Sequence, residues 1–503
     1  MIPFDTVLLI GAVVVILAVV AARVGSGIGL PALLLFLGLG MLLGDAVLGI
    51  EFSDAGLAQQ LGILALAVIL AEGGLSTKWS DIRSSVAPAA LLATLGVAVS
   101  VAVVAAFGYF VLGLDPWIAV LLGAVCTPTD AAAVFAVLRN VGIPHQLRGT
   151  LEAESGLNDA PTILLVTVAS SAAVGSADAH GSTPWSIVLL IIVELVGGLV
   201  LGAVAGWIGV QLMRRVALPA SGLYPIATVT WVMLAYALST QIHVSGFAAA
   251  YVCALILGNA GLPHRTATRS FVEGIGWIAQ IGLFVMLGLL ASPGRLTWET
   301  IGIGIAAGVV LTFVARPLSV WVSTALFRSS WQERTFLSWA GLRGAVPIVL
   351  TTIPLAAGVA GADRLFDIVL VFVIVFTLLQ GPTLPLAARL LGLYDPNTPA
   401  DVDVEVAALD RIKADLMQVR IPDGSGLGGV FVSELRLPRN VAVSLIVRDE
   451  VAFTPGDTDR IQAGDDLLIV APAALRASAE KRLRAVAKHG RLARWRGEHG
   501  QDA

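Results

Sequence analysis

A short polar segment, ESGLNDAP at residues 154–161, interrupts an apolar run that extends from about residue 150 to 174. On a helix, Glu154 lies under Asn158 and Ser155 lies under Asp159, because four residues advance the helix by only about 40°. Carboxylate, amide and hydroxyl groups would then share one face. Such oxygen-rich ligands suit a dehydrated alkali ion or a proton and do not suit a soft transition metal. The segment predicts an ion site; the alternative is a helix end that reaches the lipid headgroups.

Two other apolar runs carry a charge beside a proline in mid-span. One contains Cys-Thr-Pro-Thr-Asp at 126–130, and the other contains Gly-Leu-Arg-Gly-Ala-Val-Pro at 341–347. A proline supplies no N–H and opposes the preceding helical turn, so backbone carbonyls lose their partners. Unwound backbone at membrane depth is tolerable only beside a cavity or an ion path. We therefore expect two broken helices, with Asp130 at one break and Arg343 at the other.

Further charges lie where lipid is expected. An ionisable group at the bilayer centre costs about 2.5–3.5 kcal/mol and needs a partner or a function. Arg316, in VARPLSV, is too deep to reach the interface, and we expect it to pair with Glu154. The swapped pairing of Arg343 with Glu154 stays open. Glu72, in LAEGGLS, either lines an access funnel or is an interfacial glutamate at a helix end, and a local hydrogen bond explains Glu194.

The elements that must position these groups are membrane helices. Of the 503 residues, 57% are hydrophobic and only 13% are charged, which excludes a soluble globular protein. A helix needs about 20 apolar residues to cross a bilayer. Runs of this kind lie near residues 6–22, 28–48, 56–75, 86–113, 116–139, 150–174, 184–213, 222–240, 244–261, 270–291, 298–327, 332–358 and 365–391. We predict about thirteen transmembrane helices.

The order of the runs indicates internal symmetry and an orientation. The two broken runs are the fifth of the first six and the fifth of the last six, which is typical of inverted repeats with the site at their interface. The loops on one side contain Arg23, Lys78, Arg83, Arg139, Arg148, Arg214, Arg215, Arg265, Arg269, Arg328, Arg334 and Arg389. The other side has only Arg295 and Arg364. By the positive-inside rule, the N-terminus is outside and the C-terminal segment is cytoplasmic.

The end of the chain has a different composition. The last 113 residues hold 32 of the 66 charges, and short β-branched runs alternate with Pro-Asp-Gly and Pro-Gly-Asp turns, as expected of strands in water. We predict a transmembrane domain over 1–392, a linker over 393–403, an α+β domain over 404–473, and a C-terminal helix and tail over 474–503. The predicted fold class is an all-α polytopic membrane protein with a small cytoplasmic α+β domain.

Taken together, four segments resemble the monovalent cation:proton antiporter-1 family, which includes NhaP-like proteins and sodium/proton exchangers. They are TPTD at 127–130, ESGLNDAP at 154–161, ARPLSV at 315–320 and GLRGAVP at 341–347. The tail resembles the C-terminal half of regulator-of-K+-conductance domains, the TrkA-C domain. The first resemblance implies a homodimer, and the second implies a potassium antiporter with a small, nucleotide-type regulatory ligand.

The resemblance also implies roles for individual residues. Asp159 would bind a proton or an alkali cation in turn, with Asn158 beside it. Asp130, Thr129 and Ser155 would be its neighbours at the ion site. An Asn before the Asp resembles the electroneutral branch of the family. The family pattern further supports the ion pair of Glu154 with Arg316 and assigns Arg343 to the crossing of the broken helices.

The sequence therefore predicts a secondary antiporter of a bacterial inner membrane that exchanges K+, or Na+, for H+ by alternating access. Selectivity for Na+ on the same fold is one alternative, and a ligand-gated K+ channel is another. Titratable carboxylates at the breaks and the lack of a TVGYG-like filter favour the antiporter. The net charge of −4 provides no basic field for nucleic acid. We expect no cofactor besides the transported ions, and no enzyme activity.

Overall fold

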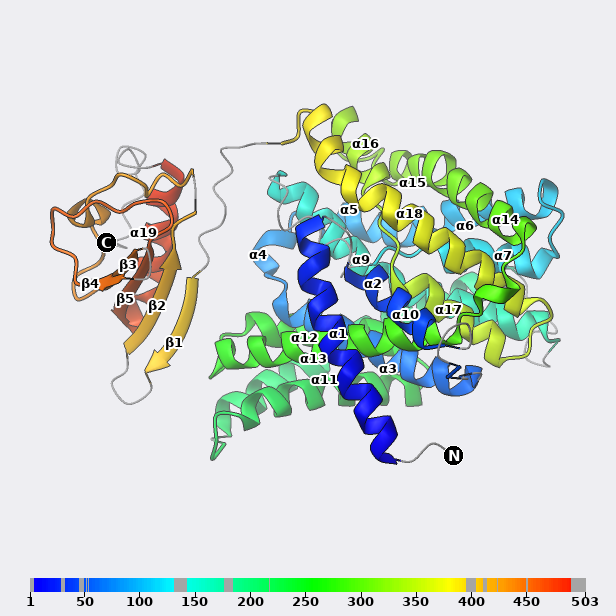
Figure 1. The fold of residues 1–503 in the computed structure, drawn as a ribbon, viewed down its shortest axis with the longest axis horizontal. Helices are drawn as coiled ribbons and strands as arrows, with labels where there is room; N and C mark the ends of the chain where they lie inside the picture. Colours follow the sequence, from blue (N-terminus) through cyan, green and yellow to red (C-terminus); the bar gives the residue numbers. More distant parts are fainter. Residues whose placement is uncertain are drawn as a thin grey trace. The chain divides into compact units, whose positions relative to one another are not determined.

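A computed structural model describes residues 4–28, 32–44, 49, 50, 52, 54–130, 143–175, 184–216, 218–394, 404–409, 414–422, 424–448 and 451–489. The chain divides into two compact units, a helical unit over Met1–Tyr394 and a second unit over Asp395–Ala503. Each unit is described by itself (Figure 1).

The helical unit begins with long apolar helices and short connections. Its first part contains α1 (Phe4–Ile28), α2 (Ala32–Leu43), α3 (Ala55–Ser76), α4 (Trp79–Ile82), α5 (Val86–Leu91), the π-helical η1 (Leu92–Gly96), α6 (Val97–Phe110), α7 (Pro116–Cys126) and α9 (His145–Ala173). Asp54 caps α3 and Asp115 caps α7 through side-chain bonds to backbone N–H groups, which satisfies donors that a helix start leaves free.

The second part is also helical. It contains α10 (Pro184–Arg215), α11 (Leu223–Gln241), α12 (Gly246–Asn259), α13 (Arg265–Leu290), η3 (Pro293–Arg295), α14 (Trp298–Val310), the π-helical η4 (Leu311–Ala315), α15 (Arg316–Ser323), α16 (Trp331–Trp339), α17 (Ala345–Ala356) and α18 (Ala362–Leu390). Among the described residues, seven continuous helices are long and apolar enough to span a membrane. The long helices overlap the predicted apolar runs, with ends that differ by several residues, and the number of thirteen crossings stays a prediction.

Two bundles make up the helical unit. Helices α1–α3 and α10–α13 pack on one another, and we term them the scaffold bundle. Helices α5–α7, α9 and α14–α18 form the second group, the core bundle. The bundles meet where α3 and α13 pack on α17 and where α12 and α10 pack on α9. The π-helical segments lie at equivalent places in the two halves, since η1 packs on α15 and η4 packs on α6, in keeping with an inverted repeat.

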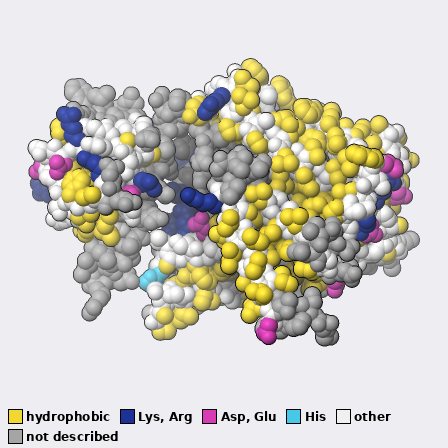
Figure 2. Space-filling model, in the orientation of Figure 1, with side chains coloured by type: hydrophobic (Ala, Val, Ile, Leu, Met, Phe, Trp, Pro, Cys, Tyr) yellow, Lys and Arg dark blue, Asp and Glu magenta, His cyan; other side chains and the backbone are white. Residues whose placement is uncertain are grey.

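The outer surface of the helical unit is apolar. Leu8 and Ile16 of α1, and Val193 and Val200 of α10, are all more than half exposed. Hydrophobic side chains cover the helical unit on the face seen in Figure 2. An apolar surface of this extent is unfavourable in water and suits lipid. The unit is a multi-pass membrane domain.

The second unit is a small α+β domain, as predicted. Its strands are β1 (Val404–Leu409), β2 (Ala414–Arg420), β3 (Ala442–Arg448), β4 (Val451–Phe453) and β5 (Asp466–Pro472), in the sheet order β1-β2-β5-β3-β4. Neighbouring strands are antiparallel. Short helices η5 (Val432–Leu435) and η6 (Ala473–Leu475) and the C-terminal α19 (Arg476–His489) complete it. Met417 pairs with Ile469, and both are buried in one core with Leu483 and Val486 of α19.

Candidate ion site

The end of α7 and the start of α17 meet in the core bundle, where the sequence predicted breaks; the continuation of the first run over 131–142 lies outside the described residues. α7 ends at Cys126, and α17 begins at Ala345 after an unwound stretch that follows α16. The backbone N–H of Asp130 donates to the carbonyl of Leu342 at 3.0 Å. The N–H of Ala345 donates to Asp130 Oδ2 at 2.9 Å. Asp130 therefore lies at the start of α17, where the helix dipole favours a negative charge.

Gly344 makes this arrangement sterically possible. A Cβ atom on Gly344 would overlap the Asp130 carboxylate, so only glycine lets the carboxylate reach the N-terminus of α17. Pro347 lies in the first turn of α17, where the missing N–H costs nothing because that donor has no partner in the helix. The break therefore precedes Pro347.

Glu154 forms a bidentate ion pair with Arg316. Arg316 Nη2 donates to Glu154 Oε2 at 2.8 Å, and Nη1 donates to Oε1. The side chains are only 2% and 5% exposed. Arg316 Nη2 also reaches the carbonyl of Leu337 at 3.3 Å. Of the two partners considered for Glu154, Arg316 is the one that contacts it.

Arg343 lies at the break between α16 and α17. It is buried, and its Nη1 atom has no hydrogen-bond partner among the described residues. The hydroxyl of Thr377 donates to the backbone carbonyl of Arg343. Arg343 and Arg316 line one small enclosed space together with Gln380. The core bundle therefore holds two buried guanidinium groups close to the single carboxylate of Glu154.

Asn158 and Ser155 connect α9 to the broken helix. Asn158 Nδ2 donates to Thr129 Oγ1 at 2.7 Å, and the hydroxyls of Thr129 and Ser155 are 2.8 Å apart. Because Thr129 accepts from Asn158, its own proton is available for Ser155. Asn158 Oδ1 is buried without a hydrogen-bond partner among the described residues. These side chains hold the unwound segment against α9.

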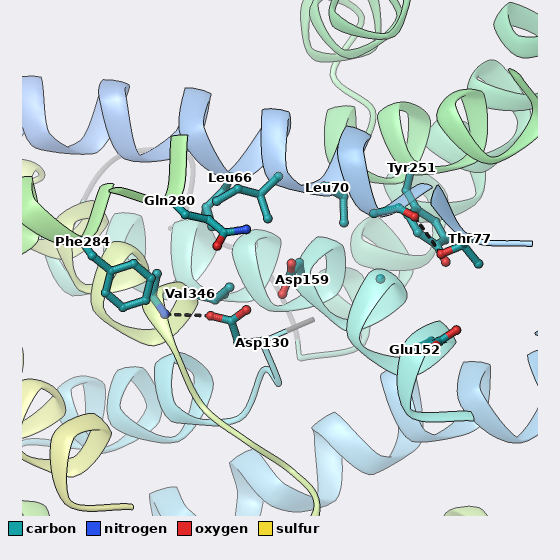
Figure 3. A pocket seen from close by; sticks show the side chains of 14 residues that line it. Leu66, Leu70, Thr77, Asp130, Glu152, Asp159, Tyr251, Gln280, Phe284 and Val346 are labelled. Carbon is teal, nitrogen blue, oxygen red and sulfur yellow. Dashed lines mark hydrogen bonds between the residues drawn. The ribbon is translucent and has the colours of Figure 1, made fainter. Parts of the chain in front are cut away.

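Asp159 faces a cavity of about 30 Å³. That volume holds on the order of two water molecules. Asp159 is 8% exposed, and its Oδ1 atom has no hydrogen-bond partner within the described part of the chain. Asp130 lines the same cavity, and Figure 3 shows both carboxylates from α9 and the broken segment at its wall. A charged carboxylate oxygen here is costly unless a proton or a cation joins it.

The polar groups of α9 have three different neighbours. Glu154 faces Arg316, Ser155 and Asn158 face Thr129, and Asp159 faces the cavity. The cavity-lining stripe of α9 is Glu152, Gly156 and Asp159, which are spaced by four and three residues. This spacing could have identified Glu152 from the sequence, but the sequence analysis did not include that residue.

Three scaffold residues at the cavity were also missed: Thr77, Tyr251 and Gln280. Tyr251 is 4% exposed, and a Cβ on Gly156 would lie 2.6 Å from its ring. The Tyr251 and Thr77 hydroxyls are hydrogen bonded (Figure 3). Because Thr77 Oγ1 donates to the carbonyl of Gly73 at 2.7 Å, Tyr251 is the donor to Thr77. No motif marked these residues: Tyr251 and Gln280 lie in ordinary apolar runs, and Thr77 lies just after one.

Glu72 and Glu194 do not line the cavity. Ser76 Oγ donates to Glu72 Oε1 at 3.4 Å, and the Glu72 side chain packs over Gly276 of α13. The backbone carbonyl of Glu194 accepts a hydrogen bond from the N–H of Ser245 at 3.0 Å. Neither is among the residues that line the cavity of Asp130 and Asp159.

Known proteins resemble this chain over most of its length. The family described as "Sodium/hydrogen exchanger, transmembrane" matches residues 11–390, and the TrkA-C domain matches residues 416–484. The K(+)/H(+) antiporter NhaP2 of Shewanella sp. strain MR-4 is 35% identical over 468 residues, which are 92% of this chain and 80% of the relative. The K(+)/H(+) antiporter NhaP of Alkalimonas amylolytica is 38% identical over 78% of this chain and 68% of its own.

Two further similarities are more distant. The Na(+)/H(+) antiporter NhaP of Pseudomonas aeruginosa is 30% identical over 65% of this chain and 80% of the relative. The solved structure of the sodium proton antiporter MjNhaP1 from Methanocaldococcus jannaschii has a TM-score of 0.65. It is 21% identical and covers 77% of this chain and 100% of its own. At that identity the match supports the fold alone.

Broken helices that meet beside buried carboxylates, in a multi-pass helical unit, define a membrane transporter. The matched family gives the same class. The chain belongs to the sodium/hydrogen exchanger family and carries a TrkA-C domain after its membrane part. The predicted family, fold class and antiporter function are confirmed, and the protein is a transporter and not an enzyme.

Proposed function

We propose that the protein exchanges K+, or less favourably Na+, for H+ across a bacterial inner membrane, with both ions competing for Asp159. The observation that carries this proposal is the buried, unpartnered Oδ1 atom of Asp159 at the cavity. Since an isolated carboxylate is costly in a medium of low dielectric constant, a proton or a cation must neutralise it. Occupation by one excludes the other, and this exclusion couples the two fluxes.

The neighbouring charges favour Asp159 as the group that titrates. Arg316 neutralises Glu154, and the N-terminus of α17 stabilises Asp130. Asn158, next to Asp159, is uncharged. This position therefore provides no carboxylate that could carry a second proton in each transport cycle. One cation would therefore exchange for one proton, and transport would be electroneutral. The ion ligands in this proposal are Asp159 and Asp130, with Asn158, Ser155 and Thr129 as supporting polar groups.

Alternating access requires one bundle to move against the other. Asp159 and Asp130 belong to the core bundle, and the opposite cavity wall belongs to the scaffold bundle. We propose that the core bundle shifts along the scaffold and opens the site to each side in turn, in a homodimer. The asymmetry of Lys and Arg among the loops supports an external N-terminus and a cytoplasmic C-terminal unit.

The relatives favour potassium over sodium. Those named K(+)/H(+) antiporters match up to 92% of this chain, whereas the relative named a Na(+)/H(+) antiporter matches 65%. We further propose that residues 1–392 transport the ions, that 393–403 are a linker, and that 404–473, followed by the helix and tail of 474–503, regulate transport through a small, nucleotide-type ligand. A ligand-gated K+ channel is disfavoured as the function, because the carboxylates of Asp159 and Asp130 each need a neutralising charge.

Proteoliposomes with an acidic lumen and a pH-sensitive dye test this function. Addition of K+, Na+ or Li+ should dissipate the pH gradient. The dissipation should persist when a permeant ion clamps the membrane potential. Because proton and cation compete, the half-saturating cation concentration should rise by up to about tenfold per pH unit below the pKa of the site. A half-saturating concentration that is independent of pH would contradict a shared site.

A further inference from the structure

The two walls of the cavity differ in polarity. The core wall carries the carboxylates of Asp130 and Asp159, and Glu152 of α9 also lines it. The scaffold wall is largely apolar and includes Leu66, Leu70 and Phe284. At one end of that wall, Thr77 and Tyr251 are hydrogen bonded to each other. Gln280 is a polar scaffold side chain that lines the cavity elsewhere. The scaffold therefore places one uncharged amide opposite two carboxylates.

Gln280 faces the cavity because of its place on α13. Ile278, on another side of this helix, is 68% exposed, whereas Gly276 packs against Glu72 of α3 and Phe284 is buried at the cavity. Gln280 lies four residues after Gly276 and four residues before Phe284, so it is on the same stripe of the helix. In Figure 3 its amide points into the cavity, toward Asp130 and Asp159.

The amide of Gln280 has no hydrogen-bond partner among the described residues. A primary amide has two donors and an acceptor oxygen, and the partly buried side chain of Gln280 makes them accessible from the cavity. The amide of Gln280 and the unpartnered Oδ1 of Asp159 line one cavity. An ion that takes oxygen ligands could contact both the Gln280 amide and the Asp159 carboxylate.

We propose that Gln280 supplies an amide oxygen ligand, from the scaffold, to the cation that Asp159 and Asp130 bind from the core. This inference rests on the proposed function. An alkali cation sheds water on entering the site, and amide or carbonyl dipoles can replace that water. A proton on Asp159 needs no such ligand. Gln280 therefore favours the cation over the proton, because the cation gains a ligand that the protonated site does not require.

The test compares Gln280→Met, Gln280→Glu and the native chain in proteoliposomes, with K+ as the probe. Methionine keeps the length of the side chain and removes the amide, whereas glutamate keeps an oxygen ligand. We expect Gln280→Met to raise the half-saturating K+ concentration by about fivefold or more, with the maximal rate within about twofold. Gln280→Glu should restore the affinity. Gln241→Met, at the exposed end of α11, is the matched control and should behave as native.

A second measurement covers a variant that loses its transport rate. K+ that binds the folded protein raises the melting temperature of the protein in detergent, and Gln280→Met should reduce this rise while the melting temperature without K+ stays near native. An unchanged half-saturating concentration in Gln280→Met would overturn the inference. The inference would also be overturned if Gln280→Met and Gln280→Glu lowered the melting temperature and lost the transport rate equally. That result would indicate a packing role for Gln280. If the native chain showed no K+-dependent proton flux, the proposed function itself would fail.

Discussion

The ion pair of Glu154 and Arg316 gives the sharpest test of the core bundle. Removing one partner of a buried pair costs about 3–5 kcal/mol, because the other charge stays buried without compensation. The two single variants should not cost the same. Glu154→Gln leaves Arg316 and Arg343 around one small enclosed space with no carboxylate between them. Arg316→Gln leaves Glu154 close enough to Arg343 for electrostatic attraction. We expect about 5 kcal/mol for the first variant and about 3 kcal/mol for the second.

The assay is unfolding of the purified protein in detergent, for the two single variants and the double variant Glu154→Gln with Arg316→Gln. The double variant should lose less than the sum of the two, by up to about 3 kcal/mol. Glu299→Gln with Arg364→Gln is the matched control, because that pair has side chains 73% and 46% exposed and should contribute at most about 1 kcal/mol. Additive losses at Glu154 and Arg316, or rescue of Glu154→Gln by neutralising Arg343 instead, would refute the reasoning.

Three further outcomes are expected. Asp159→Asn should abolish cation-driven proton flux in proteoliposomes while the protein still folds, because an amide cannot take up and release the proton; residual flux would rule out the competition. Gly156→Ala should lower the transport rate and the melting temperature, since the new Cβ would lie 2.6 Å from the Tyr251 ring and overpacking costs about 1–3 kcal/mol. Combining it with Tyr251→Leu should recover part of both losses, and a lack of recovery would place the defect elsewhere. In the second unit, burial acts to raise the pKa of Asp465, but hydrogen bonds from Arg448 and a backbone N–H hold that pKa below its usual range. A depressed pKa in the folded state stabilises the domain fully above the pKa of the unfolded chain, about 3.9, and the stabilisation is lost as the pH falls through the folded-state pKa. Hydrogen exchange of the β5 amides, corrected for its intrinsic pH dependence, should show this loss in the native chain; an equal loss in Asp465→Asn would contradict it.

Much of the architecture could be predicted because membrane insertion depends on local properties of the sequence. Apolar length, loop charge and the position of proline are all visible along the chain, and lipid leaves the backbone few alternatives to the helix. The breaks after Cys126 and before Ala345 follow from proline beside a charge in an apolar run. The α+β character of the second unit likewise follows from its short β-branched runs and turn residues.

The grouping of side chains around the ion site was decided by tertiary packing. The sequence by itself determined that α9 carries Glu154 and Asp159, but a helix turns by 100° per residue, which separates these two positions by about 140°. Which neighbour each meets depends on how α9 lies between the two bundles. Arg316 and Gln280 come from distant helices, and apolar runs of similar composition do not specify which of their faces meet. Only packing in three dimensions placed one carboxylate on an arginine and left the other at the cavity.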